Sequence, residues 1–303
     1  MVKSSTALII LNPVAGMVNE KILRRLIENR FHAAGWTTHV HLTKPNEDLC
    51  TIIQEETAKG IDVVVAAGGD GTIAAVAGGL AHSKIPLGII PCGTWNAIGR
   101  HFRISTTPVR AITTITGAHK MRRMDLMEVG DHLHTMNLGV GFSSTMVANT
   151  SRSEKRRLGN LAYYANFLKQ FFGLKLKKYV IDADGKVFRG RASEIMVANY
   201  GIVGLNFIEN TLNICPDDGK IDVFIFKART FSDLPGMFWE AFVQHKKRTP
   251  KYHHLSAVKK LNIQTSPPLH VQADGELLGK TPITLTVLSR SVKVIVPKNY
   301  PAN

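Results

Sequence analysis

Residues 63–72 read Val63-Val-Val-Ala-Ala-Gly-Gly-Asp-Gly-Thr72, an apolar run that ends in three glycines and one aspartate. The apolar part is typical of a strand buried on both faces, and residues 73–80 continue with a helical pattern. Glycines let a backbone approach a ligand closely, and the free N–H groups at a helix start attract an anion. The stretch therefore predicts a strand, a phosphate-binding turn and a helix.

Asp70 is the one acidic residue in this turn. A carboxylate among amides that face a phosphate would repel the ligand, so we expect Asp70 to act through Mg²⁺. The alternative is a strand-to-helix turn in which Asp70 caps the helix. A dinucleotide-binding fingerprint fits poorly because no acid for a ribose follows about 20 residues later, and a Walker A loop would require a lysine after the glycines.

Two further turns of small polar residues follow apolar runs in the first part of the chain. Asn12-Pro13-Val14-Ala15-Gly16 follows the run at 7–11, and Pro91-Cys-Gly-Thr-Trp-Asn96 follows the run at 86–90. Each turn alone also fits a plain connection between a strand and a helix. If the strands are parallel, their carboxyl ends meet at one edge of the sheet, and the three turns together form a cradle for a polyphosphate.

The distribution of apolar runs predicts two domains of different architecture. Strand-like runs and helical patterns alternate over residues 1–123, which predicts an open parallel α/β sheet. We expect its strands at 7–11, 38–42, 61–66 and 86–90, and its helices at 19–34, 46–59, 72–82 and 107–117. Residues 124–303 carry runs rich in Val, Ile and Phe that are divided by Asp-Gly turns, which predicts an antiparallel β domain with helical stretches near 159–172 and 231–247. Its last residues are expected to pack back on the first domain.

Two acidic turns lie in the second half of the chain. Asp217-Asp-Gly-Lys-Ile-Asp222 brings oxygen donors close together, and Mg²⁺ prefers carboxylate, carbonyl and water ligands. Asp274-Gly275-Glu276 places a glycine between two acids, and phosphoryl transfer to an alcohol needs a carboxylate that accepts the hydroxyl proton. The alternative for both segments is an Asp-Gly hairpin turn without a chemical role.

In their order along the chain, these motifs resemble the diacylglycerol kinase catalytic family, including its bacterial lipid kinase and sphingosine kinase branches. The resemblance covers nearly the whole chain and consists of N-P-x-x-G at 12–16, G-G-D-G-T at 68–72, P-x-G-T-x-N at 91–96, D-D-G-x-x-D at 217–222 and D-G-E at 274–276. It implies an α/β nucleotide-binding domain joined to a β-sandwich-like domain, with ATP and the substrate in the cleft between them.

The resemblance also implies roles for individual residues. ATP would be bound by the three turns and by a threonine after the second strand, namely Asn12, Pro13, Gly16, Thr43, Gly68, Gly69, Asp70, Gly71, Thr72, Thr94 and Asn96. For Thr43 the alternative is a hydroxyl that ends a strand. Mg²⁺ would be held by the Asp218 carboxylate and the carbonyls of Cys215 and Lys220, in addition to Asp70. The proton acceptor lies in the 274–276 turn, where we favour Glu276 as the base with Asp274 beside it.

Two residues depart from the family pattern. Ala15 stands where the family often has serine, which removes one hydroxyl that could bind a phosphate. Ala97 stands where the family often has aspartate after the asparagine of the third turn, and this departure leaves the acceptor subtype open. Diacylglycerol, monoacylglycerol, a sphingoid base and a polyprenol all present a hydroxyl next to apolar chains.

The charge balance narrows the choice of partners. The sequence has 38 Lys+Arg against 23 Asp+Glu, and a formal charge of +15 attracts polyanions. We expect no nucleic-acid partner, because no Lys/Arg block with interleaved aromatic residues and no zinc-finger spacing occurs. Basic residues instead flank an apolar helical pattern in the segment 152–178, which is typical of a helix on an anionic membrane. A helix packed on its own domain fits the same pattern.

Cysteine spacing and the lack of a long apolar span indicate the compartment. The three cysteines lie far apart, and no apolar stretch approaches the roughly 20 residues that span a bilayer. We therefore expect a cytoplasmic protein with peripheral contact to the inner membrane face. The leading hypothesis is an ATP- and Mg²⁺-dependent lipid kinase, and the alternatives are an NAD kinase-like phosphotransferase and a catalytically silent nucleotide- or lipid-binding protein.

Overall fold

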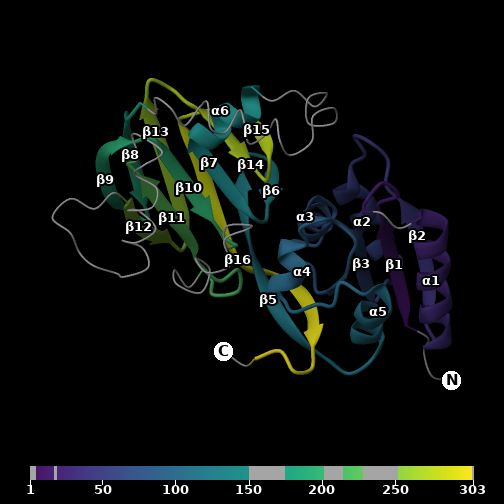
Figure 1. Ribbon diagram of the computed structural model, residues 1–303. Coiled ribbons are helices and arrows are strands. Elements are labelled where there is room, and N and C mark those ends of the chain that lie inside the picture. Colours follow the sequence, from purple (N-terminus) through teal and green to yellow (C-terminus); the bar gives the residue numbers. More distant parts are fainter. Residues whose placement is uncertain (1–4, 17–18, 150–174, 201–213, 228–251, 302–303) are drawn as a thin grey trace. The chain divides into compact units, whose positions relative to one another are not determined.

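The computed structural model describes residues 5–16, 19–149, 175–200, 214–227 and 252–301 (Figure 1). The chain forms two compact units. The first unit comprises Met1–Leu126 and Arg290–Asn303, and the second comprises Met127–Ser289. Strands β5 (His119–Val129) and β16 (Ile283–Pro297) each begin in one unit and end in the other.

The first unit is built on a mainly parallel sheet, as predicted. Its strands run in the order β2-β1-β3-β4-β16, with β1 at Thr6–Leu11, β2 at Thr37–Leu42, β3 at Val63–Gly68 and β4 at Leu87–Pro91. Each neighbouring pair in this order is parallel. All residues of β3 and β4 are buried, which explains why their sequences are apolar without alternation.

Five helices accompany this sheet in the described part of the first unit. They are α1 (Glu20–Ala33), α2 (Leu49–Thr57), α3 (Asp70–Gly79), α4 (Ala97–His101) and α5 (Pro108–Thr116). Helix α3 begins two residues before the expected position, because Gly69 is its extended N-cap and Asp70 favours the positive end of the helix. Helix α4 was not predicted, since it is only five residues long and starts after Asn96 in the left-handed conformation.

The second unit contains a six-stranded antiparallel sheet and the antiparallel part of the ten-stranded sheet to which the parallel strands of the first unit also belong. One has the order β12-β11-β10-β7-β14-β15, and β16 is followed by β13, β8 and β9 in the other. The strands are β7 (Asn137–Gly141), β8 (Lys177–Ala183), β9 (Lys186–Ala192), β10 (Glu194–Ala198), β11 (Ile221–Phe226), β12 (Tyr252–Ala257), β13 (Lys260–Ser266), β14 (His270–Ala273) and β15 (Glu276–Lys280). One hydrophobic cluster includes side chains from both sheets, such as Val140 and Ile263. This arrangement confirms the predicted β-sandwich-like architecture.

Two of the predicted Asp-Gly hairpin turns are confirmed. Asp184-Gly185 joins β8 to β9, and Asp274-Gly275 joins β14 to β15, with positive φ at all four residues. Asp218-Gly219 instead lies in a turn that precedes β11. A short strand β6 (His132–His134) and a helix α6 (Phe142–Asn149) flank β7.

The expected helices near 159–172 and 231–247 lie outside the described residues. Among the helices within the described ranges, none combines the length and apolarity required to cross a bilayer.

Candidate functional site

The residues predicted to bind ATP lie at the carboxyl ends of the parallel strands in the first unit. Asn12, Pro13 and Gly16 follow β1, and Thr43 follows β2. The remaining residues are at the end of β3 and the start of α3, or in the loop between β4 and α4: Gly68, Gly69, Asp70, Gly71, Thr72, Thr94 and Asn96. Because neighbouring parallel strands end at the same edge, the turns lie side by side.

Asn12 connects the first turn to α3. Its side-chain Nδ2 donates to Thr72 Oγ1 at 3.0 Å, and its Oδ1 accepts the N–H of Val14 at 3.1 Å. Its backbone N–H donates to the carbonyl of Ala67 at 3.0 Å. The side chain therefore fixes the shape of its own loop and the distance from that loop to the helix.

Glycines allow the turns to approach one another. A Cβ at Gly16 would lie 2.0 Å from the carbonyl oxygen of Cys92, and a Cβ at Gly93 would lie 2.6 Å from the Cα of Gly69. Both distances are far below van der Waals contact. The backbone of the three turns thus converges more closely than side chains would permit.

Asp70 links α3 to α4. Its Oδ1 accepts the N–H of Ile98 at 3.0 Å, which satisfies a backbone donor in the first turn of α4. Asn96, which is 5% exposed, closes the same loop by accepting the N–H of Gly93 and donating to the Gly93 carbonyl, both at 2.8 Å. Oδ1 of Asp70 therefore has a structural role. The expected contact of Asp70 with Mg²⁺ stays a prediction.

The start of α3 remains available to an anion. Its N-cap is Gly69, and no side chain of the described residues caps its first N–H groups. Burial raises the pKa of the neighbouring Cys92 thiol to about 11, so this thiol adds no negative charge near neutral pH. The free N–H groups at the helix start therefore suit a phosphate, whereas the Asp70 carboxylate in the same turn repels it unless a cation intervenes.

Thr43 lies on a loop that is fixed by Glu47. Glu47 Oε2 is 3.0 Å from both His41 Nε2 and the backbone N of Lys44. These contacts lower the pKa of the Glu47 carboxyl, with the hydrogen bond from His41 as the largest cause. The backbone N–H of Thr43 donates to the carbonyl of Leu11 at 3.0 Å, so the threonine is held beside the end of β1.

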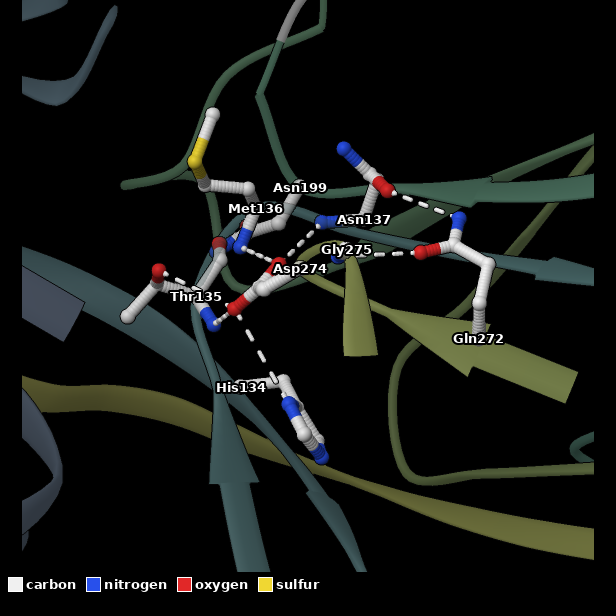
Figure 2. Close-up of polar contacts among 8 residues, drawn as sticks. All are labelled: His134, Thr135, Met136, Asn137, Asn199, Gln272, Asp274 and Gly275. Atoms are coloured by element: carbon white, nitrogen blue, oxygen red, sulfur yellow. Dashed lines mark hydrogen bonds and ion pairs between the residues drawn. The ribbon is translucent and has the colours of Figure 1, made fainter. Parts of the chain in front are cut away.

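Asp274 is held in the second unit by donors on the segment that leads into β7 (Figure 2). Oδ1 accepts the N–H groups of Met136 and Asn137 at 3.0 and 2.9 Å. Oδ2 accepts the N–H of Thr135 at 2.9 Å and lies 3.5 Å from its hydroxyl. Both oxygens are thus used to tie the 274–276 turn to β7.

Glu276 differs from Asp274 although it is only two residues away. It is exposed at the start of β15, and no hydrogen bond to its carboxylate occurs within the described residues. Gln272 holds the turn that carries Glu276, because its Oε1 accepts the N–H of Gly275 at 3.0 Å (Figure 2). The backbone of the turn is thus held in place, and the exposed Glu276 side chain is accessible to a ligand.

His134 lies beside both acids of the turn. Its Nδ1 is 3.9 Å from Asp274 Oδ2, and it interacts electrostatically with Glu276 as well. Burial lowers the pKa of this imidazole, while the two carboxylates partly oppose the effect. The lowered pKa favours the neutral form of the His134 imidazole.

The residues that support the turn could not be identified from the sequence. Thr135 and Asp274 are 139 positions apart, Asn137 and Gln272 are 135 positions apart, and only the fold brings them together. Gln272 offered one signal, because it is a polar residue within the apolar run of β14 and is only 7% exposed. Asn137 offered a similar signal at the first position of β7.

The predicted metal loop precedes β11 in the second unit. Asp218 Oδ1 accepts the N–H of Lys220 at 3.1 Å, and Lys220 Nζ is 3.4 Å from Oδ2. Burial raises the pKa of the Asp218 carboxyl, and the contacts with Lys220 only partly oppose this effect. The negative charge of this partly buried carboxylate is neutralised only in part by Lys220. The carboxylate is therefore suited to bind a cation.

The other acids of this motif do not join Asp218 in a cluster of side chains. Asp222, which is 2% exposed, lies 2.7 Å from His254 Nε2 on β12. Within the described ranges, no three His, Cys, Asp or Glu side chains converge as a metal site. Magnesium at this loop would therefore depend on Asp218, backbone carbonyls and water.

A partly buried acid in the second unit was not identified from the sequence. Glu194 on β10 accepts a hydrogen bond from the Ser143 hydroxyl at 2.5 Å and from the Ser143 N–H at 3.0 Å. Burial raises the pKa of this carboxyl to about 8, against the lowering effect of these bonds. Its position within the apolar run 193–198 was the one available signal.

Family models match both units. Residues 6–129 match the model described as "Diacylglycerol kinase catalytic domain". Residues 135–296 match the model described as "YegS C-terminal NAD kinase beta sandwich-like domain". Together the two matches extend over most of the chain.

Individual relatives agree with these models. A "Putative lipid kinase" of Staphylococcus carnosus is 27% identical over 80% of this chain and 80% of its own length. An "Uncharacterized protein" of Synechocystis is 28% identical over 97% of this chain and 71% of its own length. The crystal structure of a "putative diacylglycerol kinase" from Bacillus anthracis has a TM-score of 0.79 and 26% identity, with 99% of this chain and 98% of that chain covered.

Proposed function

Since the chain belongs to the diacylglycerol kinase family, we propose that it transfers the γ-phosphoryl group of ATP to the hydroxyl of diacylglycerol or a related lipid alcohol. One observation carries this proposal. Asp274 uses both carboxylate oxygens to fix a turn, and Glu276 on the same turn is exposed and free to react. A protein that only binds a nucleotide has no need of a supported, open carboxylate.

The turns of the first unit would hold the triphosphate. The uncapped N–H groups at the start of α3 and the glycine backbone at 68–71 would donate to phosphate oxygens. The hydroxyls of Thr94 and Thr43 would add contacts at the edges of the cradle. Asn12 and Asn96 would act chiefly by holding the loops, since their amides already bond within the protein.

Magnesium would be held by the Asp218 carboxylate and the carbonyls of Cys215 and Lys220, with Asp70 contributing its second oxygen near the phosphates. When bound, the ion would offset the negative charge of the transferring phosphoryl group.

Glu276 would accept the proton of the lipid hydroxyl as that oxygen bonds to the γ-phosphorus of ATP, while the bond from this phosphorus to the β,γ-bridging oxygen breaks and ADP leaves. The exposure of its side chain lets the carboxylate reach a hydroxyl that enters from solvent or from a lipid surface. Asp274 would act as a positioning residue, because its hydrogen bonds to residues 135–137 keep the turn in place.

NAD kinase-like activity is the second candidate. It is favoured by the description of the model that matches residues 135–296, which refers to an NAD kinase β-sandwich. The acceptor would then be a soluble ribose hydroxyl instead of a lipid. The same carboxylate chemistry would serve either acceptor.

A phosphorylation assay distinguishes the two candidates. The full chain is incubated with labelled ATP and Mg²⁺ against diacylglycerol, monoacylglycerol, a sphingoid base and a polyprenol in mixed micelles, and against NAD in solution. We expect label in at least one lipid and none in NAD. Transfer to NAD alone would establish the second candidate, and ATP binding without any transfer would indicate a silent binder.

A further inference from the structure

The β8–β9 hairpin of the second unit is rich in positive charge. Residues 175–192 include six Lys or Arg and two Asp. Both aspartates serve the backbone of turns: Asp182 accepts the N–H of Gly185 at 2.8 Å, and Asp184 accepts three N–H groups at the start of β13 at 2.6 to 2.9 Å. Neither aspartate therefore forms an ion pair with a Lys or Arg of the hairpin within the described residues.

Strand pairing places three of these cations on one face. The opposite face of β8 is buried and carries Tyr179, Ile181 and Ala183. Side chains alternate along a strand, and directly paired residues share a face. Lys178 with its partner Arg191, and Val180 with its partner Arg189, therefore lie on the outer face of the hairpin.

The three cations repel one another, and the one acid that strand pairing places on their face, Asp182 opposite Val187, accepts the N–H of Gly185. Lys178 and Arg191 are directly opposite, an arrangement that destabilises a sheet when the charges have the same sign. Lys178, Arg189 and Arg191 are exposed, and none forms an ion pair with any other residue in the described part of the chain. On the next strand, the neighbours Ser266 and Gln264 are neutral.

We propose that this outer face, formed by Lys178, Arg189 and Arg191, binds the surface of an anionic bilayer. Arg189 and Arg191 are two residues apart on a strand and so about 7 Å from each other, which spreads the charge along a surface. Val187 lies on the same face and is 49% exposed, so it adds an apolar contact at the level of the headgroups. A flat row of this kind fits many headgroups better than one small anion.

The proposed surface is separate from the phosphoryl-transfer chemistry. It lies on β8 and β9, whereas Glu276 lies on β15 of the other sheet in the same unit. The membrane would provide the proposed lipid acceptor, but binding itself requires neither ATP nor an intact base. The two proposals can therefore fail independently.

Vesicle binding tests the proposal. The full chain is incubated without ATP with vesicles of phosphatidylglycerol and phosphatidylcholine, or of phosphatidylcholine alone, and bound protein is measured by flotation. Replacement of three cations near an anionic surface should weaken partitioning roughly a hundredfold. We expect this loss for the triple variant Lys178→Gln, Arg189→Gln and Arg191→Gln, on anionic vesicles only.

A matched variant controls for net charge. Lys21, Arg25 and Arg30 are exposed on α1, and their replacement by Gln removes the same charge elsewhere. We expect the α1 variant to bind nearly as well as the parent protein. Unchanged binding of the hairpin variant, or an equal loss in the α1 variant, would overturn the proposal.

Four further measurements distinguish loss of membrane binding from other effects of the substitutions. Neither variant should unfold at a lower temperature than the parent protein, and the substitutions Arg189→Lys and Arg191→Lys, which retain the charge, should preserve binding. Activity on lipid in detergent micelles should be unaffected in the hairpin variant. A hairpin that bound duplex DNA more tightly than anionic vesicles at the same salt concentration would contradict the assignment of a bilayer as its partner.

Discussion

The cradle of the first unit and the 274–276 turn of the second unit use polar side chains in different ways. In the cradle, Asn12, Asp70 and Asn96 bond to the protein itself, and the backbone is left to meet the ligand. In the turn, Asp274 bonds to the protein and the side chain of Glu276 is left to meet the ligand. Under the proposed function, phosphate binding would rely on backbone shape, whereas proton transfer would rely on one free side chain.

This contrast predicts which substitutions affect the fold and which affect only the chemistry. Residues that hold loops should change the free energy of unfolding, and a residue left for the substrate should not.

Glu194 should produce the largest effect, and the effect should depend on pH. Its pKa is about 8 in the folded protein against 4.5 in a free side chain, so the unfolded chain loses this proton first as pH rises. The folded protein should therefore lose stability between about pH 4.5 and pH 8, on the order of 4 kcal/mol. In Glu194→Gln this pH dependence should disappear, as measured by urea unfolding at pH 5, 6.5, 8 and 9. Parallel stability curves for the two proteins would refute the burial of a neutral acid at this position.

Asp274→Ala should destabilise the second unit by about 3 kcal/mol, because three backbone N–H groups lose their acceptor. Asp274→Asn keeps one acceptor oxygen and should lose less. Thermal and urea unfolding measure both effects. If Asp274→Ala were as stable as the parent protein, Asp274 would not be a residue that holds the turn.

Gly16→Ala should cost about 2 kcal/mol, because it combines a positive φ of 74° with a Cβ that would collide with the Cys92 carbonyl. Gly35→Ala is a matched control, since Gly35 has a φ of 80° and no atom within 4 Å of the added Cβ. Only Gly16→Ala should also weaken ATP binding, by roughly tenfold, as measured by calorimetry. Equal effects of the two substitutions would show that the close approach of the turns is unimportant.

Local sequence patterns predicted strands β1 to β4 and helices α1, α2, α3 and α5 of the first unit, and the antiparallel β class of the second unit. The uninterrupted apolar run of β3 indicated a strand buried on both faces, and the pairs Asp184-Gly185 and Asp274-Gly275 indicated hairpins. These features depend on residues within a few positions of one another. Helix α4 escaped prediction because five residues do not establish a helical period.

The sequence did not predict which residues of the candidate site hold the backbone in place and which are accessible to a ligand. Asp70 bonds to Ile98, which is 28 residues away, and Asp274 bonds to a segment 137 to 139 residues away. Asp274 and Glu276 are chemically similar acids, and only tertiary contacts separate the one that holds the turn from the one that is open. The raised pKa of Glu194 likewise depends on burial by residues distant in the chain.

The variant Glu276→Gln decides whether the open carboxylate of the turn is the base. Its rate of phosphoryl transfer from ATP to diacylglycerol is compared with that of the parent protein, together with its ATP affinity and its free energy of unfolding. We expect turnover to slow by roughly a hundredfold to ten-thousandfold, as is typical for the loss of a general base, while ATP affinity and stability stay unchanged. A Glu276→Gln protein that phosphorylates the lipid at the parent rate would show that Glu276 is not the proton acceptor.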